Sequence, residues 1–420
     1  MRFRIRNVLA DTRPLANKDY ARLWYANIIT VIGAQLTIVV VPAQLWAITG
    51  DSTYVGLTGV FGLVPLVVFG LWGGAIADAI DRRTVLMIST IGLIVTSAGL
   101  AVQAWMGVEN VWLILTIFAM QQAFFALNQP ARSAIIPMLV PTEQIPAANA
   151  LNMTVFSFGA IAGPLVGGAL LPILGAAWLY GLDAVTLLAT LWAVIKLPHL
   201  EPTGKSKSLG LRSVIDGFRY TWVHKILLVS FVIDLIAMVF GMPRALYPQI
   251  ANLDFGGPSG GGMEFAILSA SMAVGALVGG VFSGWVSRVR RQGLAVIVAI
   301  LVWGAAIVGF GASVGLAGGV ALPFLIGAFA MLALGGAADM ASAAFRQSIL
   351  QTAATDDVRG RLQGVFIVVV AGGPRIADVL HGYAANYFSA AWVVAGGGIL
   401  VILGTLICAA ASPQFRRYRI

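Results

Sequence analysis

Long apolar stretches alternate with short polar segments along the whole chain. Each stretch has about 20 apolar residues, enough for a helix that crosses a hydrocarbon core about 30 Å thick. The pattern therefore predicts an all-α membrane protein with twelve transmembrane helices. These helices are expected at residues 23–46, 54–77, 84–105, 111–136, 149–171, 176–196, 226–249, 263–287, 294–314, 321–347, 362–386 and 391–411.

The longest polar interval, residues 197–225, divides the predicted helices six and six. It contains Pro198, Pro202, Gly204 and a run of Lys and Ser, which is typical of a flexible linker. We therefore expect an N-terminal arm, a six-helix bundle, a linker, a second six-helix bundle and a tail. The expected bounds are residues 1–22, 23–196, 197–225, 226–411 and 412–420.

Positive charge is absent from every second polar segment. By the positive-inside rule, segments without Lys or Arg face away from the cytoplasm, so both termini are expected to be cytoplasmic. This pattern predicts a multi-pass protein of the cytoplasmic membrane of a bacterium. The segments that contain none of the 26 basic residues are 47–53, 106–110, 172–175, 250–262, 315–320 and 387–390.

Composition narrows the class of protein further. The chain is 59% hydrophobic and 10% charged, with a mean hydropathy of +0.91. A net charge of +9 would suggest a nucleic-acid partner for a soluble protein. Here the basic residues lie in inside loops, where they meet anionic lipid, so we expect a lipid bilayer and no nucleic acid as partner. Cys408 is the only cysteine and the three His are scattered, so no metal, cofactor or catalytic site is predicted.

The two predicted bundles carry matching landmarks at a nearly constant separation in sequence. Duplicated six-helix halves are typical of secondary transporters, whose substrate site lies between the halves near the bilayer midplane. The matched landmarks are Gly73-Gly74 with Gly279-Gly280, Arg132 with Arg346, and Gly163-Pro164 with Gly373-Pro374.

The segment GGAIADAIDRRTVL, residues 73–86, resembles the loop between helices 2 and 3 of the major facilitator superfamily. It departs from that pattern at Ala79, where a basic residue is common, and at Asp81, where glycine is usual. The resemblance implies a cytoplasmic gate in which Asp78 faces a helix N-terminus of the other half and the arginines meet carboxylates. The expected gate residues are Gly74, Asp78, Arg82, Arg83 and, near the inner end of helix 4, Arg132.

A second segment, GAIAGPLVGG at residues 159–168, resembles the helix 5 motif of proton-driven exporters, although Ala150 replaces an earlier glycine. With NQPARSAIIPMLVP and RALYPQIA, the match is similar to the twelve-helix branch containing the enterobactin exporter and macrolide or multidrug efflux pumps. Close helix approach and a proline kink would serve gating here. The motif residues are Gly159, Gly163, Pro164, Gly167 and Gly168.

Ionisable residues inside a membrane are costly, so each is a functional candidate. Asp234 and Asp339 have no opposite charge within four residues on their own helices, and the resemblance implies that helices 7 and 10 line the cavity. They are the expected proton carriers, with Asp378 as a further candidate, although Asp339 could instead bridge to Arg346. The resemblance implies a packing or capping position for Asp183, with a transport role as the alternative.

Polar side chains on the helices expected to border the cavity are candidates for substrate contact. Hydrogen bonding between helices is an equal alternative for each amide. Arg375 could also form a structural pair with Asp378, three residues further along its helix. The candidates are Asn27, Gln35, Gln121, Gln122, Asn128 and Arg375.

The sequence thus predicts a proton-driven secondary exporter, acting by alternating access on a bulky small molecule such as a siderophore or a drug. Its partners would be this substrate, protons and the bilayer, and we expect a monomer. A single proton entering down a 100 mV potential yields about 2.3 kcal/mol, which supports a gradient of several tens-fold. A nutrient importer of the same fold and a membrane sensor without transport are the alternatives.

Overall fold

The computed structural model describes the backbone of residues 11–199, 216, 219–317, 321–353 and 356–419. Within these ranges every regular element is a helix and no strand occurs, which confirms the predicted all-α fold. The predicted linker falls largely outside the described residues. So do the side chains of residues 71–79, 321, 356–361, 363–364 and 366–368.

The first bundle contains α1 to α5. Helix α1 packs against α5, α2 against α4, and α3 against both α4 and α5. Short 3-10 turns, η2 (Arg13–Ala16) and η3 (Thr142–Gln144), precede α1 and α5. The helices are α1 (Lys18–Thr49), α2 (Ser52–Ala79), α3 (Arg82–Trp105), α4 (Val111–Leu139) and α5 (Ile145–Ile195).

The second bundle contains α7 to α14. Helix α10 packs against α11 and α13, α9 against α11, and α7 against α12 and α13. After α7 the chain is broken into the short elements η4 (Arg244–Leu246), α8 (Tyr247–Gln249) and η5 (Ile250–Asp254), and η6 (Ser283–Arg288) follows α9. The other helices are α7 (Lys225–Phe240), α9 (Met263–Val281), α10 (Gln292–Leu316), α11 (Ala321–Ala353), α12 (Asp356–Ala384), α13 (Ala390–Ala411) and α14 (Pro413–Arg416).

Ten helices among the described residues are long and apolar enough to cross a membrane. One of them, Thr142–Ile195, has 54 residues, about twice the length that one crossing needs. Gly175 interrupts it with φ 77° and ψ 165°, a backbone conformation that favours glycine. This break lies at the outer segment predicted between helices 5 and 6. The total of twelve crossings stays a prediction.

Polar residues at the helix ends explain several boundaries. The side chain of Asn17 accepts hydrogen bonds from the backbone N–H groups of Asp19 and Tyr20 at the start of α1. Asp81 accepts from Thr84 N–H at the start of α3, so the residue that departs from the superfamily pattern is a helix cap here. Gly50, in the left-handed region, ends α1.

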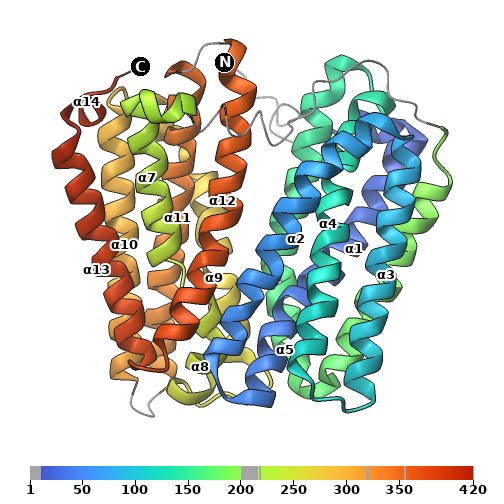
Figure 1. The fold of residues 1–420 in the computed structure, drawn as a ribbon, viewed down its shortest axis with the longest axis horizontal. Coiled ribbons are helices and arrows are strands. Elements are labelled where there is room, and N and C mark those ends of the chain that lie inside the picture. Colours follow the sequence, from blue (N-terminus) through green and yellow to red (C-terminus); the bar gives the residue numbers. More distant parts are fainter. Residues whose placement is uncertain (1–10, 200–215, 217–218, 318–320, 354–355, 420) are drawn as a thin grey trace, which may run out of the picture.

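The two bundles meet at the end opposite the termini and splay apart toward the termini (Figure 1). The main contacts between them are α2 with α12 and α5 with α9. Gly56 and Gly59 of α2 lie directly against backbone carbonyl groups of Asp378 and Arg375, and Gly382 of α12 lies against Ser52. Because glycine has no side chain, the two backbones can approach closely there.

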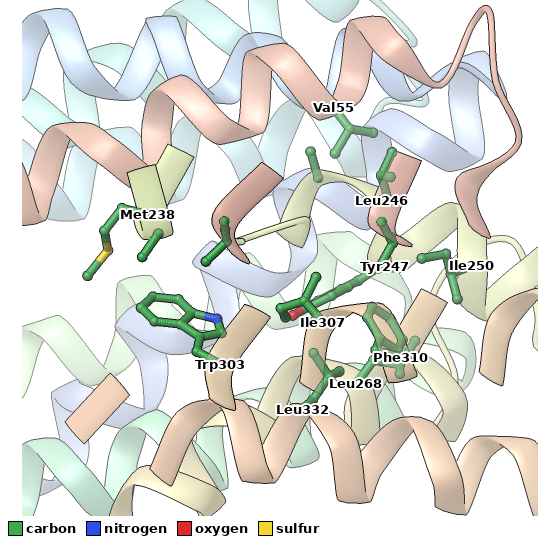
Figure 2. Close-up of a cluster of buried hydrophobic side chains, with 14 of the residues drawn as sticks. Val55, Met238, Leu246, Tyr247, Ile250, Leu268, Trp303, Ile307, Phe310 and Leu332 are labelled. Carbon is green, nitrogen blue, oxygen red and sulfur yellow. The ribbon is translucent and has the colours of Figure 1, made fainter. Parts of the chain in front are cut away.

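A buried apolar cluster extends from the second bundle into the first. Figure 2 shows Trp303, Tyr247 and Phe310 in this cluster, together with Val55 of the first bundle. The rings of Tyr247 and Phe310 meet edge to face, with their centroids 6.1 Å apart. Trp303 donates a hydrogen bond from Nε1 to the carbonyl oxygen of Gly241 at 3.3 Å. Gly241 directly follows α7, and Arg244 begins η4 beside it, at the boundary between the bundles.

Candidate functional site

A cavity of about 330 Å³ lies between the two bundles. Its walls come from α1, α2, α4 and α5 on one side and from η4, α8, α9 and α12 on the other. Apolar and aromatic side chains dominate, with a few polar groups among them, as is usual for small-molecule sites. The polar and aromatic lining residues are Gln35, Thr58, Phe118, Arg244, Tyr247, Phe265, Ser269, Arg375 and Asp378.

Arg375 reaches from α12 across the boundary to the first bundle. Its guanidinium donates a hydrogen bond from Nη2 to Gln122 Oε1 at 3.2 Å and lies 5.9 Å from the ring centroid of Phe118. It also lies against Gly62 of α2, where a Cβ atom would approach Nη1 to 2.6 Å. Of the predicted substrate contacts, Gln35 and Arg375 therefore line the cavity, and Gln122 holds Arg375 in place.

Asp378 also lines the cavity, and its ion-pair partner is not Arg375. Its carboxylate forms an ion pair with Arg244 of η4, with Nη2 and Oδ2 separated by 3.2 Å. The side chain of Asp378 is 7% exposed and that of Arg244 is 44% exposed. The suggested pair between Arg375 and Asp378 is replaced by this contact, because the broken chain after α7 brings Arg244 closer.

Asp234 and Asp339 converge on Arg346, inside the second bundle. Arg346 forms an ion pair with Asp234 of α7, and its Nη2 lies 3.8 Å from Asp339 Oδ1. It also donates to Ser342 from Nε at 3.1 Å. The side chains of Arg346 and Asp234 are 3% and 0% exposed, whereas Asp339 is 24% exposed. The sequence showed no partner for Asp234 because Arg346 comes from another helix.

Asp183 is buried inside the first bundle, 1% exposed. Its Oδ2 accepts hydrogen bonds from Thr37 at 2.6 Å and Ser97 at 2.8 Å, and Gln121 Nε2 lies 3.5 Å away. Gln121 also donates to Ser97 at 2.9 Å. Predicted as a substrate contact, Gln121 instead joins a polar network in which residues of α1, α3 and α4 surround Asp183 of α5.

The two remaining amides also bond within the first bundle. Arg132 of α4 donates to Asn27 of α1. Asn128 donates to Ser89 at 2.9 Å and lies 3.3 Å from Thr90, both on α3. Asn27 and Asn128 thus make the helix-to-helix contacts that were the alternative to a substrate role.

Three glycines of the helix 5 motif follow one face of α5, and the fourth faces the other bundle. Gly159, Gly163 and Gly167 lie against Val31, Gln35 and Leu36 of α1, while Pro164 lines the cavity. Gly168 meets Ala266 of α9, and its carbonyl oxygen accepts from Gly262 N–H at 2.9 Å. The motif therefore packs α5 against α1 within one bundle and against α9 of the other. Its role in gating stays a prediction.

The predicted cytoplasmic gate is described only in part. Gly74 and Asp78 belong to α2, but the surroundings of Gly74 and the side chain of Asp78 lie outside the described part of the chain. Arg82 and Arg83 each donate at 2.7 Å to backbone carbonyl oxygens, of Ala134 and Ile195. Both acceptors belong to the same bundle as the arginines, and neither is a carboxylate. The expected contact of these arginines with carboxylates stays a prediction. Exposed carbonyls at helix ends attract cations, which explains the contact at the end of α5.

Sequence reasoning missed Arg244, Tyr247 and Ser269 as lining residues. In the sequence, Arg244 falls inside an apolar stretch. The sequence does contain a signal for these residues, since Pro243 directly precedes RALYPQIA and interrupts an apolar stretch. Interrupted transmembrane helices often border the binding site of a transporter.

Comparisons with known proteins match this architecture. The model of the transmembrane secretion effector family matches residues 10–416. The chain belongs to this family of the major facilitator superfamily. The enterobactin exporter EntS of Shigella boydii is 29% identical over 408 residues, covering 95% of this chain and 93% of the relative. EntS of Escherichia coli O139:H28 is 28% identical over the same length.

Solved structures place this member of the secretion effector family among transporters of the same fold. A peptide transporter, POT, superposes with a TM-score of 0.78 at 12% identity, covering 96% of each chain. A bacterial homologue of the iron transporter ferroportin, in an inward-facing state, superposes with a TM-score of 0.67 at 14% identity, covering 94% of this chain and 99% of that chain. The chain is a membrane transporter and not an enzyme.

Proposed function

We propose that the chain exports a bulky small molecule, of the siderophore class, from the cytoplasm of a bacterium in exchange for protons. The cavity between the bundles carries this proposal, since both halves contribute to its walls. Similarity to enterobactin exporters over 95% of the chain supports both the direction of transport and the class of substrate. The absence of Lys and Arg from alternate loops supports an inner membrane location with both termini in the cytoplasm.

Contacts between the bundles support alternating access. Ser52 donates to Gln249 at 2.6 Å, and Asn386 donates to Thr53 at 2.7 Å, both between bundles. These contacts lie where α1 and α2 meet, at the end of the molecule opposite the termini (Figure 1). With the termini in the cytoplasm, this conformation is closed to the outside, and transport requires these hydrogen bonds to break.

Asp234, Arg346 and Asp339 form the proposed proton site. Two carboxylates share one guanidinium, so the group has a net charge of −1 when both are ionised, and binding one proton makes it neutral. A buried net charge is costly, which favours uptake of a proton when the site is closed to water. Asp339 is the better carrier of the two, because it is partly exposed and more distant from Arg346 than Asp234 is.

Transport of labelled enterobactin into everted membrane vesicles tests the function. A pH gradient with an acidic vesicle interior should drive accumulation of the substrate in vesicles that contain the protein. A protonophore should abolish this accumulation. Vesicles with the Asp339→Asn variant, which keeps the size of the side chain, serve as the matched control. Accumulation only in right-side-out vesicles would show an importer, and no substrate-dependent proton flux in either orientation would overturn the proposed transport.

A further inference from the structure

Two guanidinium groups and one carboxylate face the cavity. Asp378 already neutralises Arg244, at 3.2 Å, so Arg375 brings the net charge of the three groups to +1. Arg375 has five N–H donors, and the structure gives it one hydrogen bond, to the neutral amide of Gln122. A guanidinium between the bundles with unused N–H donors favours a ligand group that is negatively charged or a strong hydrogen-bond acceptor.

We propose that Arg375 is the binding site for an anionic group of the transported molecule, whose aromatic or apolar body lies against Phe118, Tyr247 and Phe265. This inference rests on the proposed function and names the chemistry of its substrate: a carboxylate, sulfonate, phosphate or ionised phenol. Guanidinium groups bind such oxyanions through two parallel hydrogen bonds, which fixes the orientation of the ligand as well as its charge.

The geometry prepares Arg375 for this role. Gly62 leaves room for the planar guanidinium against α2, Phe118 lies 5.9 Å from it, and Gln122 fixes one edge. These three contacts come from the first bundle, although Arg375 belongs to the second. A ligand at Arg375 is therefore bound at the boundary that changes during transport, where its affinity can differ between the two conformations.

Asp378 acts in this arrangement as an internal competitor of the ligand. Its carboxylate and the ligand anion are attracted to the same pair of guanidiniums, so ionised Asp378 weakens anion binding. When a neutral side chain replaces Asp378, Arg244 also becomes available to the ligand. Replacing Asp378 with Asn is therefore expected to tighten the binding of an anion and to leave that of a neutral molecule nearly unchanged.

The test uses two fluorescent probes with the same ring system, anilinonaphthalene sulfonate and uncharged N-phenylnaphthylamine. Titrations are done on the full chain in lipid nanodiscs, with the signal of empty nanodiscs subtracted. We expect wild-type protein to bind the sulfonate more tightly than the neutral probe, and Arg375→Gln to weaken sulfonate binding by about tenfold, the loss of one charge-assisted hydrogen bond. Binding of the neutral probe should change less than that.

Arg22→Gln is the matched control, since Arg22 pairs with Asp19 at 3.1 Å at the start of α1 and does not line the cavity. It should leave the affinity for both probes unchanged. Equal affinity of the wild type for the two probes, or a sulfonate preference that persists in Arg375→Gln, would overturn the proposal. If Arg375→Gln does not fold, Asp378→Asn decides, because weaker sulfonate binding in that variant contradicts the competition.

A second measurement distinguishes a failure of the anion site from a failure of the proposed function. Export of enterobactin into everted vesicles is measured on the same variants. A wild-type protein that exports under a proton gradient but shows no preference for the sulfonate retains the proposed function and loses the anion site. A protein that prefers the sulfonate but gives no substrate-dependent proton flux retains the site and loses the proposed function.

Discussion

Arg346 of α11 forms an ion pair with Asp234 of α7, and the two side chains are 3% and 0% exposed. With Asp339 at 3.8 Å, this one cation lies between two carboxylates inside the second bundle. Its counterpart at the matched position of the first bundle, Arg132, donates to the neutral Asn27. An arginine therefore occupies the matched position in both bundles, but its partners are carboxylates in the second bundle and a neutral amide in the first.

Removing Arg346 should destabilise the protein more than removing Arg132. Arg346→Gln leaves two carboxylates in an apolar interior, and breaking such a pair costs about 3–5 kcal/mol. Arg132→Gln loses a hydrogen bond to a neutral partner, which costs about 1–3 kcal/mol. Thermal unfolding of the detergent-purified variants, followed by tryptophan fluorescence, measures the difference. Adding Asp234→Asn and Asp339→Asn to Arg346→Gln should restore part of the lost stability. Equal unfolding temperatures for the two single Arg variants would contradict the cost assigned to the unpaired carboxylates.

Asp339→Asn should abolish transport against a gradient while leaving downhill exchange of the substrate measurable. The amide keeps the shape of the side chain but cannot carry a proton, so only the coupled step is lost. Accumulation and exchange are measured separately in vesicles. Asp183→Asn is the comparison in the first bundle, since an amide oxygen can still accept from Thr37 and Ser97, and it should keep coupling. Full proton-driven accumulation in Asp339→Asn, in Asp234→Asn and in the double variant would move the carrier role to Asp378 or Asp183.

Gly59→Ala should prevent the outer ends of the bundles from closing. A Cβ atom at Gly59 would meet the carbonyl oxygen of Arg375 on α12, and backbone cannot yield as a flexible side chain can. The conformational equilibrium should shift toward the state that is open to the outside. A cysteine at Ser269, which lines the cavity, reports this shift by faster labelling from outside in a background without Cys408.

Gly70→Ala provides the control on the same helix, because no atom lies within 4 Å of the position where its Cβ would be. It should leave the labelling rate of Ser269→Cys unchanged. Faster labelling in both glycine variants would point to a general loosening of α2, and no change in either would show that the α2 and α12 contact does not control access.

The orientation of the chain predicts which loops an impermeant thiol reagent can reach. Ser259, in the segment before α9, and Glu143, before α5, are both exposed. In a Cys408→Ser background, Ser259→Cys should react in intact cells, whereas Glu143→Cys should react only after the cells are permeabilised. The reverse pattern would place the termini outside and contradict the distribution of basic residues.

The sequence alone determined the class of fold and predicted a division into two halves. Both depend on features that are periodic or local: stretches long enough to span a bilayer, basic residues in alternate loops, and paired landmarks such as Gly163 and Gly373. The helix 5 motif could also be located from sequence, through its resemblance to the motif of proton-driven exporters. Its neighbours on α1 and α9 could not be named in this way.

Only the tertiary structure decided which polar residues meet. Asp234 lacked a partner within its own helix, yet Arg346 lies beside it, because helices far apart in the chain pack side by side. Asp378 pairs with Arg244 rather than with Arg375 for the same reason, since the chain breaks after α7 and turns η4 toward α12. Inside a membrane, a charge is stabilised by whichever opposite charge the packing brings near. Sequence spacing along one helix cannot supply that information.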